Sequence, residues 1–207
     1  MSKQRILVWD LPTRLFHWLL AGTFAGAWLT AESERWANVH ATLGYTFAGL
    51  IAFRLVWGFI GTRYARFSSF VAGPGAVGRY LLSILTFRPE HHVGHNPAGG
   101  WAVLALLGLG IVTALSGYAA FNDIGGHWLE ELHEGAASAM LALVLVHIGA
   151  VLVSSLIHRE NLVRAMWNGF KQGSPAEAIR RKRWIAAGAL LAFVAGIWTA
   201  AIQGALP

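Results

Sequence analysis

The sequence predicts an all-α membrane protein: a four-helix transmembrane bundle followed by a fifth transmembrane helix. Hydrophobic residues make up 56% of its 207 residues and charged residues only 13%, about half the charged share of a typical soluble domain. Crossing a bilayer takes about 20 apolar residues. Five runs reach or approach that length, the first of them with its flanks, at residues 15–30, 40–60, 101–121, 135–157 and 184–202. We therefore expect one integral-membrane domain over residues 1–207.

Basic residues predict how the chain is oriented in the membrane. With the N-terminus in the cytoplasm, 14 of the 16 lysines and arginines fall in cytoplasmic segments and only Arg35 lies outside. This bias is typical of bacterial inner-membrane proteins, and it places the C-terminus in the periplasm. It also accounts for the net charge of +6 without a nucleic-acid partner. Arg5, Asp10 and Arg14 crowd the first run, and no small-residue cleavage site follows it, so we expect no secretory signal.

The connecting segments differ in character on the two sides of the membrane. The cytoplasmic segment 61–100 contains "AVGRYLLSILTF", whose helical spacing and apolar face predict a helix on the membrane surface. The outer loops are short and acidic. Their carboxylates are Glu32, Glu34, Asp123, Glu130, Glu131 and Glu134. We call these six residues the acidic collar.

Four histidines fall at two depths in this topology. His17 and His147 are near the cytoplasmic side, and His40 and His133 are near the outer side. His133 and His147 are fourteen residues apart, about 40° short of four helical turns, so both rings leave one helix face about 21 Å apart. An imidazole in a membrane span needs a partner. Two imidazoles from different helices at each depth predict one metal centre per level.

The ligand set indicates which metal group these levels hold. Two histidines alone make a poor zinc or non-haem iron site, which needs three or four protein ligands. Haem supplies four nitrogens itself and needs only axial partners. Because the chain has no cysteine, covalent attachment through C-x-x-C-H is excluded. We expect two haems b, one on His17 and His147 and one on His40 and His133. Small residues could make room for them: Gly22, Gly26, Gly44, Gly49, Ala136 and Ala137.

The motifs resemble those of the bacterial cytochrome b561 family, in particular the branch with the b-type cytochrome subunits of nickel–iron hydrogenases. The resemblance rests on "VWDLPTRLFHWLLAG", His40 at the start of the second run, "HNPAGGW" and the His133–His147 interval, and covers about residues 6–160. It implies a four-helix core with two b haems on those four histidines. It also implies electron transfer between a quinone and another redox partner. The fifth run, at about 184–203, departs from the four-helix members.

Two arginines near the inner level have alternative interpretations. Arg54 lies fourteen residues after His40 and so on nearly the same helix face, where it could pair with a haem propionate or extend to the cytoplasmic surface. Arg14, one turn before His17, could bind a propionate or anchor the topology. We include both as cofactor-binding candidates. Trp18, beside His17, could pack on a haem or in the core.

Two classes of function fit the sequence. The first is an electron-transfer subunit that connects a quinone with a hydrogenase, a dehydrogenase or a periplasmic cytochrome c, and whether it is itself a quinone oxidoreductase stays open. The acidic collar favours a positively charged soluble partner at the outer site. The alternative is a membrane non-haem metal-dependent oxygenase built on His91, His92 and His95, although such sites need more histidine motifs than this cluster supplies.

Overall fold

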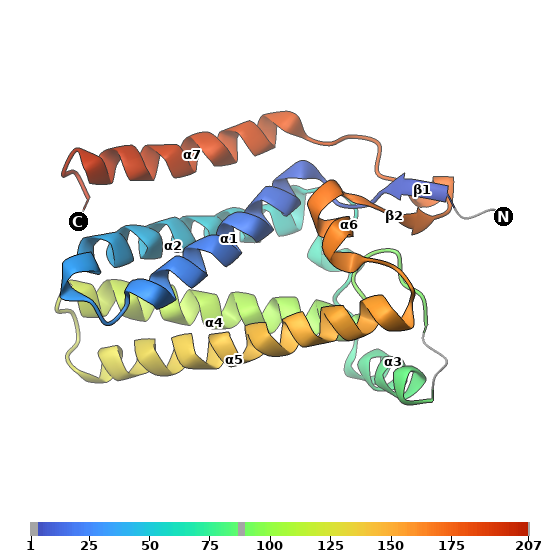
Figure 1. The fold of residues 1–207 in the computed structure, drawn as a ribbon, viewed down its shortest axis with the longest axis horizontal. Helices are drawn as coiled ribbons and strands as arrows, with labels where there is room; N and C mark the ends of the chain where they lie inside the picture. The colour runs from blue at the N-terminus through green and yellow to red at the C-terminus, as the bar shows by residue number, and fades with distance from the viewer. Residues whose placement is uncertain (1–3, 87–89, 207) are drawn as a thin grey trace. The chain divides into compact units, whose positions relative to one another are not determined.

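The computed structural model describes residues 4–86 and 90–206, and helices dominate it (Figure 1). The elements, in chain order, are β1 (Gln4–Leu7), α1 (Leu11–Thr30), α2 (Ala37–Ile60), α3 (Pro74–Leu85), α4 (Pro97–Phe121), α5 (Trp128–Ile157), α6 (Leu162–Asn168), β2 (Phe170–Gly173) and α7 (Trp184–Ile202). Three short 3-10 turns lie at Glu34–Trp36, Phe67–Ser69 and Pro175–Glu177. The prediction of an all-α architecture therefore holds except for the two short strands.

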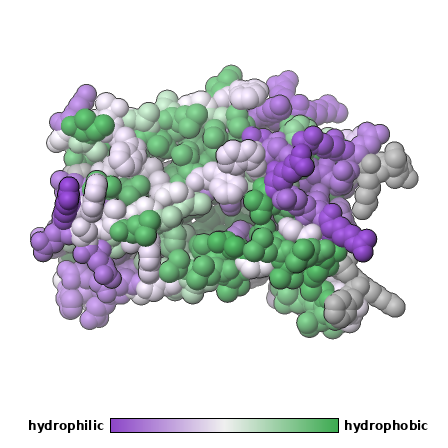
Figure 2. Space-filling view, viewed as in Figure 1, coloured by the Kyte–Doolittle hydropathy of each residue, from purple (hydrophilic) through white to green (hydrophobic). Residues whose placement is uncertain are grey.

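Four helices in the described part of the chain are long and apolar enough to cross a membrane. They are Glu34–Ile60, which includes α2, together with α4, α5 and α7. Figure 2 shows hydrophobic side chains over the middle of the long helices and hydrophilic ones near their ends. Helix α1 has 20 residues but is not among the four, and Arg14 and His17 are two residues that lower its hydropathy. That α1 spans the membrane stays a prediction.

The chain forms two compact units, which we describe separately. The first contains the described residues of 1–14, 56–106 and 142–182. Its core is formed by Ile6, Val8, Trp9, Tyr64, Ala165 and Ile179. Strands β1 and β2 pair antiparallel, with Gln4 opposite Gly173 and Leu7 opposite Phe170. The sequence does not predict this sheet, because each strand has only four residues and the two are far apart in the chain.

An ion pair with a buried lysine holds β2 in place in the first unit. Lys171 Nζ lies 3.4 Å from Glu160 Oε2 and donates a hydrogen bond to the His92 carbonyl at 3.2 Å. Burial lowers the pKa of Lys171, and the neighbouring Glu160 carboxylate offsets part of that shift. The contact joins β2 to the segment before α4 and to the turn after α5.

The predicted surface helix in segment 61–100 exists as α3. Tyr80 is its buried residue, and its ring contacts His92 with centroids 5.6 Å apart. Leu81, Leu82 and Leu85 are exposed. Exposed leucines beside a buried aromatic ring fit a helix that lies on a lipid surface.

The second unit contains residues 15–55, 107–141 and the described residues from 183 onward. Helices α2 and α4 pack closely where Gly110 faces Phe47 and Ile51, both almost fully buried. Helix α7 packs on α2, and a Cβ on Gly49 would overlap the Phe193 ring. Gly49 thus provides a contact for α7, which is the predicted fifth membrane span. The sequence had predicted that Gly49 makes room for a haem. Gly22 and Gly44 have open space where a Cβ would point, and their role beside a haem stays a prediction.

Candidate haem site

His40 and His133 face each other in the second unit. His40 lies in the first turn of α2 and His133 in the second turn of α5. Their ring centroids are 6.1 Å apart and the ring planes stand at 87°. A metal–imidazole bond of about 2 Å on each side, plus the ring radii, needs a centroid separation of roughly 6 Å. The two rings are thus spaced as axial ligands of one metal ion would be.

The Nδ1 atoms of both rings are engaged by backbone carbonyls. His40 Nδ1 lies 2.9 Å from the Ala27 oxygen of α1, and His133 Nδ1 lies 2.9 Å from the Thr113 oxygen of α4. A carbonyl only accepts hydrogen bonds, so each Nδ1 is the donor, and the lone pair of each neutral ring is on Nε2. This is the tautomer of a metal-bound histidine whose second nitrogen is oriented by a backbone acceptor.

The two carbonyls are not equivalent acceptors. Ala27 is one of the last four residues of α1, whose carbonyls have no amide partner one turn further along the helix. The Ala31 amide, which would be that partner, instead donates to Trp28. Thr113 lies in the interior of α4, where its carbonyl also accepts the helical amide bond. Each carbonyl also accepts a hydroxyl of its own helix, Thr30 Oγ1 at 3.1 Å for Ala27 and Ser116 Oγ at 3.3 Å for Thr113. His40 therefore donates to the carbonyl that lacks a helical amide partner, at the negative end of a helix dipole.

His17 and His147 lie on α1 and α5 but belong to different compact units. Their pairing stays a prediction. The His17 ring contacts Trp18 edge-to-face, with centroids 4.9 Å apart. Trp18 therefore contacts the ring of the expected haem ligand itself.

The two candidate arginines differ in their surroundings. Arg54 on α2 is 3% exposed, which argues against extension of its side chain to the cytoplasmic surface. Arg14 Nη1 donates a hydrogen bond to the Asn168 carbonyl at the end of α6, 2.8 Å away. The structure thus gives Arg14 a structural contact in the first unit, and propionate binding by either arginine stays a prediction.

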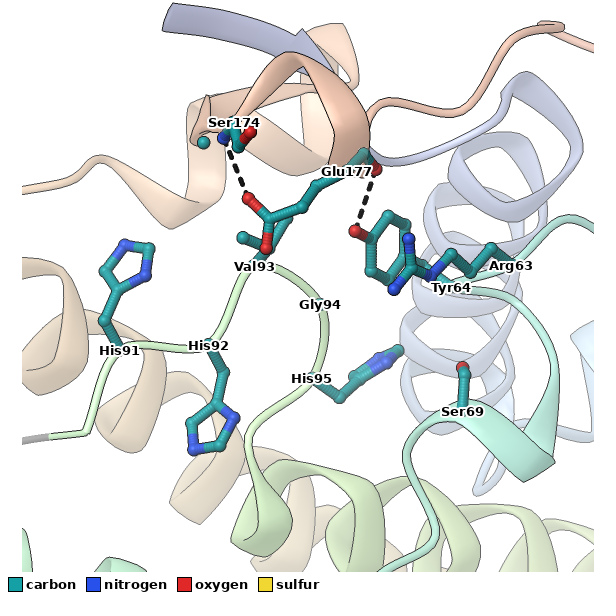
Figure 3. Close-up of a pocket in the computed structure, with 11 residues that line it drawn as sticks. Arg63, Tyr64, Ser69, His91, His92, Val93, Gly94, His95, Ser174 and Glu177 are labelled. Atoms are coloured by element: carbon teal, nitrogen blue, oxygen red, sulfur yellow. Dashed lines mark hydrogen bonds between the residues drawn. The ribbon is translucent and has the colours of Figure 1, made fainter. Parts of the chain in front are cut away.

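The cluster His91, His92 and His95 lines a cavity of about 420 Å³ in the first unit (Figure 3). The three rings have different neighbours: His91 contacts His158, His92 contacts Tyr80, and His95 lies between Trp9 and Phe70. No group of three or more histidine, cysteine or acidic side chains that could hold a metal exists among the described residues. The oxygenase alternative therefore has no metal site in the described part of the chain.

Two of the motifs that carry the family resemblance are helix starts. Asp10 in "DLPTR" precedes α1, and its Oδ1 accepts the Thr13 amide at 2.8 Å. Asn96 in "HNPAGG" precedes α4, and its Oδ1 accepts the Gly99 amide at 2.7 Å. Both side chains are N-caps followed closely by proline, a combination that favours helix initiation. An aspartate or asparagine followed closely by a proline is the sequence signal for this capping role.

The fold and the site together define a class: a helical membrane protein whose paired imidazoles suit axial ligation of a b-type haem. A family model described as prokaryotic cytochrome b561 matches residues 8–169, and the chain belongs to this family. The resemblance seen in the sequence motifs is thereby confirmed. The protein is a membrane b-type cytochrome that takes part in electron transfer.

Several curated relatives have similar names. The chain is 23% identical to the probable Ni/Fe-hydrogenase B-type cytochrome subunit of Rhizobium leguminosarum bv. viciae, over 82% of this chain and 90% of that protein. It is 24% identical to the Cupriavidus necator counterpart, over 79% and 86%. Against the probable Ni/Fe-hydrogenase 1 B-type cytochrome subunit of Escherichia coli K12 the identity is 21%, over 79% and 89%. No solved structure is significantly similar to this chain.

Proposed function

We propose that this protein is a di-haem cytochrome that passes electrons across the membrane between a quinone and a redox partner protein. The observation that carries the proposal is the His40–His133 pair, with its ring spacing and its two carbonyl-bound Nδ1 atoms. We call this pair the outer site, following the predicted topology. His17 and His147 form the proposed inner site. A bound haem supplies reversible one-electron chemistry, and the histidines set its potential through their basicity.

The chain itself contributes position and insulation. His133 and His147 are on one helix, α5, and fourteen residues correspond to about 21 Å along its axis. The apolar residues between them would keep water away from the intervening path. Helix α5 would thus hold the two sites at opposite membrane faces.

The partner at the membrane surface is proposed from the relatives. Three of them are named as cytochrome subunits of Ni/Fe-hydrogenases, which supports a hydrogenase as the redox partner. A periplasmic cytochrome c is the second candidate, and the observation that favours it is the acidic collar, whose six carboxylate residues are all exposed. A quinone would complete the electron path inside the membrane.

The haem content tests the proposal directly. The purified protein should carry two haems b per chain, both low-spin when oxidised, because two imidazoles occupy the axial positions of each. A pyridine haemochrome assay and an optical spectrum measure this. One haem per chain, or a high-spin spectrum, would reject the four-ligand assignment.

The acidic collar predicts how a soluble partner would dock. His127 Nδ1 lies 2.7 Å from Glu130 Oε2, and His127 Nε2 lies 3.7 Å from Glu131 Oε1. The hydrogen bond to Glu130 raises the pKa of His127, and the Glu130 and Glu131 charges add to the shift. As the pH falls through that raised pKa, His127 gains a positive charge and the collar loses net negative charge.

Electron exchange with a basic cytochrome c should therefore slow as salt rises and as the pH falls through the His127 titration, because electrostatic steering acts on the association rate. Stopped-flow kinetics would measure both dependences. Neutralising Glu130, Glu131 and Glu134 together should flatten the salt dependence, and His127→Gln should remove its part of the pH dependence. A rate indifferent to salt and to these substitutions would favour a tightly bound partner subunit instead.

A further inference from the structure

We infer that Gly117 of α4 is a positioning residue for His133: it fixes how the imidazole approaches the metal. This inference rests on the proposed ligation of a haem by His133. A Cβ atom built on Gly117 would lie 2.7 Å from both Cε1 and Nδ1 of the His133 ring and 3.5 Å from Nε2. Real side chains do not tolerate contacts of 2.7 Å. The imidazole therefore lies directly against the α4 backbone, in space that only glycine leaves open.

The acceptor of the His133 hydrogen bond lies on the same face of α4. Thr113 precedes Gly117 by four residues, about one helical turn, and its carbonyl oxygen is 2.9 Å from His133 Nδ1. The ring is thus held at two points, by the α4 backbone at Gly117 and by the Thr113 carbonyl. The carbonyl fixes the tautomer. The close approach to the backbone at Gly117 sets the distance and tilt of the ring that allow the hydrogen bond to form.

The orientation held in this way is defined relative to His40. The two ring planes stand at 87°, and each ring is tied to a different helix through its Nδ1. Nearly perpendicular axial imidazoles give a low-spin ferric haem a highly anisotropic EPR signal, whereas parallel planes give a rhombic one. Ring orientation is therefore a measurable property of this site.

Other glycines of α4 do not have this role. Gly110 faces Phe47 and Ile51 of α2. Gly108 has no atom within 4 Å of an added Cβ, and its nine-residue separation from Gly117 is two and a half turns, which places it on the opposite face of the helix. Gly108→Ala is thus a matched control, with the same helix and the same gain in helix propensity but no effect on His133.

The experiment compares the haem-loaded wild type with Gly117→Ala and Gly108→Ala. In Gly117→Ala the ring has to move by about 1 Å to restore an ordinary contact of 3.5–4 Å, which lengthens or breaks the bond to Thr113. A weaker Nδ1–H bond makes the imidazole a less basic ligand. We expect the EPR signal of one haem to shift and its midpoint potential to rise, while the other haem and the whole Gly108→Ala protein keep wild-type values.

The outcomes separate this inference from the proposed function. If His133→Ala retains both haems with unaltered spectra, the proposed ligation fails and the inference fails with it. If His133→Ala loses a haem but Gly117→Ala leaves both EPR signals and both potentials unchanged, only the inference is overturned. The unshifted haem in the same chain reports that the protein has folded. Should Gly117→Ala not accumulate, the wild-type spectrum decides: a highly anisotropic signal supports the held orientation, and two rhombic signals overturn it.

Discussion

His40→Ala and His133→Ala should each reduce the haem content from two per chain to one. Either substitution removes one of the two imidazoles that we propose as axial ligands at the outer site, whose ring centroids are 6.1 Å apart, and the remaining ring would have no ligand opposite it. No other histidine lies within one turn of either residue along its helix, so replacement by a neighbouring imidazole is not expected. A haemochrome assay combined with a redox titration would count the remaining components.

The matched control for these variants is His127→Ala. His127 immediately precedes α5, six residues before His133, but it is exposed and its ring contacts Glu130 rather than a second histidine. His127→Ala should keep both haems. The inner pair is tested in the same way, since His17→Ala and His147→Ala should alter one and the same redox component. If His17→Ala and His133→Ala affected the same component, the assignment of ligands by membrane depth would be wrong.

Asp10→Ala should destabilise the protein by about 4–7 kcal/mol. The Asp10 carboxylate is 1% exposed and accepts three hydrogen bonds: from the Thr13 amide at 2.8 Å, from Trp57 Nε1 at 3.1 Å and from Thr62 Oγ1 at 2.6 Å. Loss of the N-cap costs about 1 kcal/mol. Loss of two buried hydrogen bonds to a charged group costs roughly 1.5–3 kcal/mol each.

Unfolding in detergent, followed by circular dichroism, would measure this effect. Asp10→Asn keeps one carbonyl oxygen as an acceptor and should lose less stability than Asp10→Ala. Glu32→Ala, at an exposed carboxylate, serves as the control and should change stability by no more than about 0.5 kcal/mol. Equal effects of Asp10→Ala and Glu32→Ala would show that the three hydrogen bonds contribute little.

Asp10 also shows how a family motif divides between structure and chemistry. Within "DLPTRLFHW", Asp10 caps α1 and binds the end of α2 through Trp57, and Arg14 binds the end of α6. Only His17 remains as a cofactor ligand in our proposal. Much of the motif is therefore explained by the need to start a helix at a fixed place, without direct contact to haem.

The sequence by itself determined the long helices and the class of protein. Apolar runs of span length have few folded alternatives in a membrane, because backbone groups in lipid must be paired within the segment. The same periodicity placed His133 and His147 on one helix, α5. The family motifs then supplied the cofactor class, which the match to prokaryotic cytochrome b561 confirmed.

Only the tertiary structure decided the contacts between distant residues. The predicted topology had put His40 and His133 at one depth, and the structure set their ring centroids 6.1 Å apart, gave their Nδ1 atoms the carbonyls of Ala27 and Thr113, and paired β1 with β2. It also turned Gly49 toward α7 and gave His91, His92 and His95 separate neighbours. The physical reason is that helical periodicity defines the face of a residue on its own helix, whereas its partner depends on how side chains of several helices interlock.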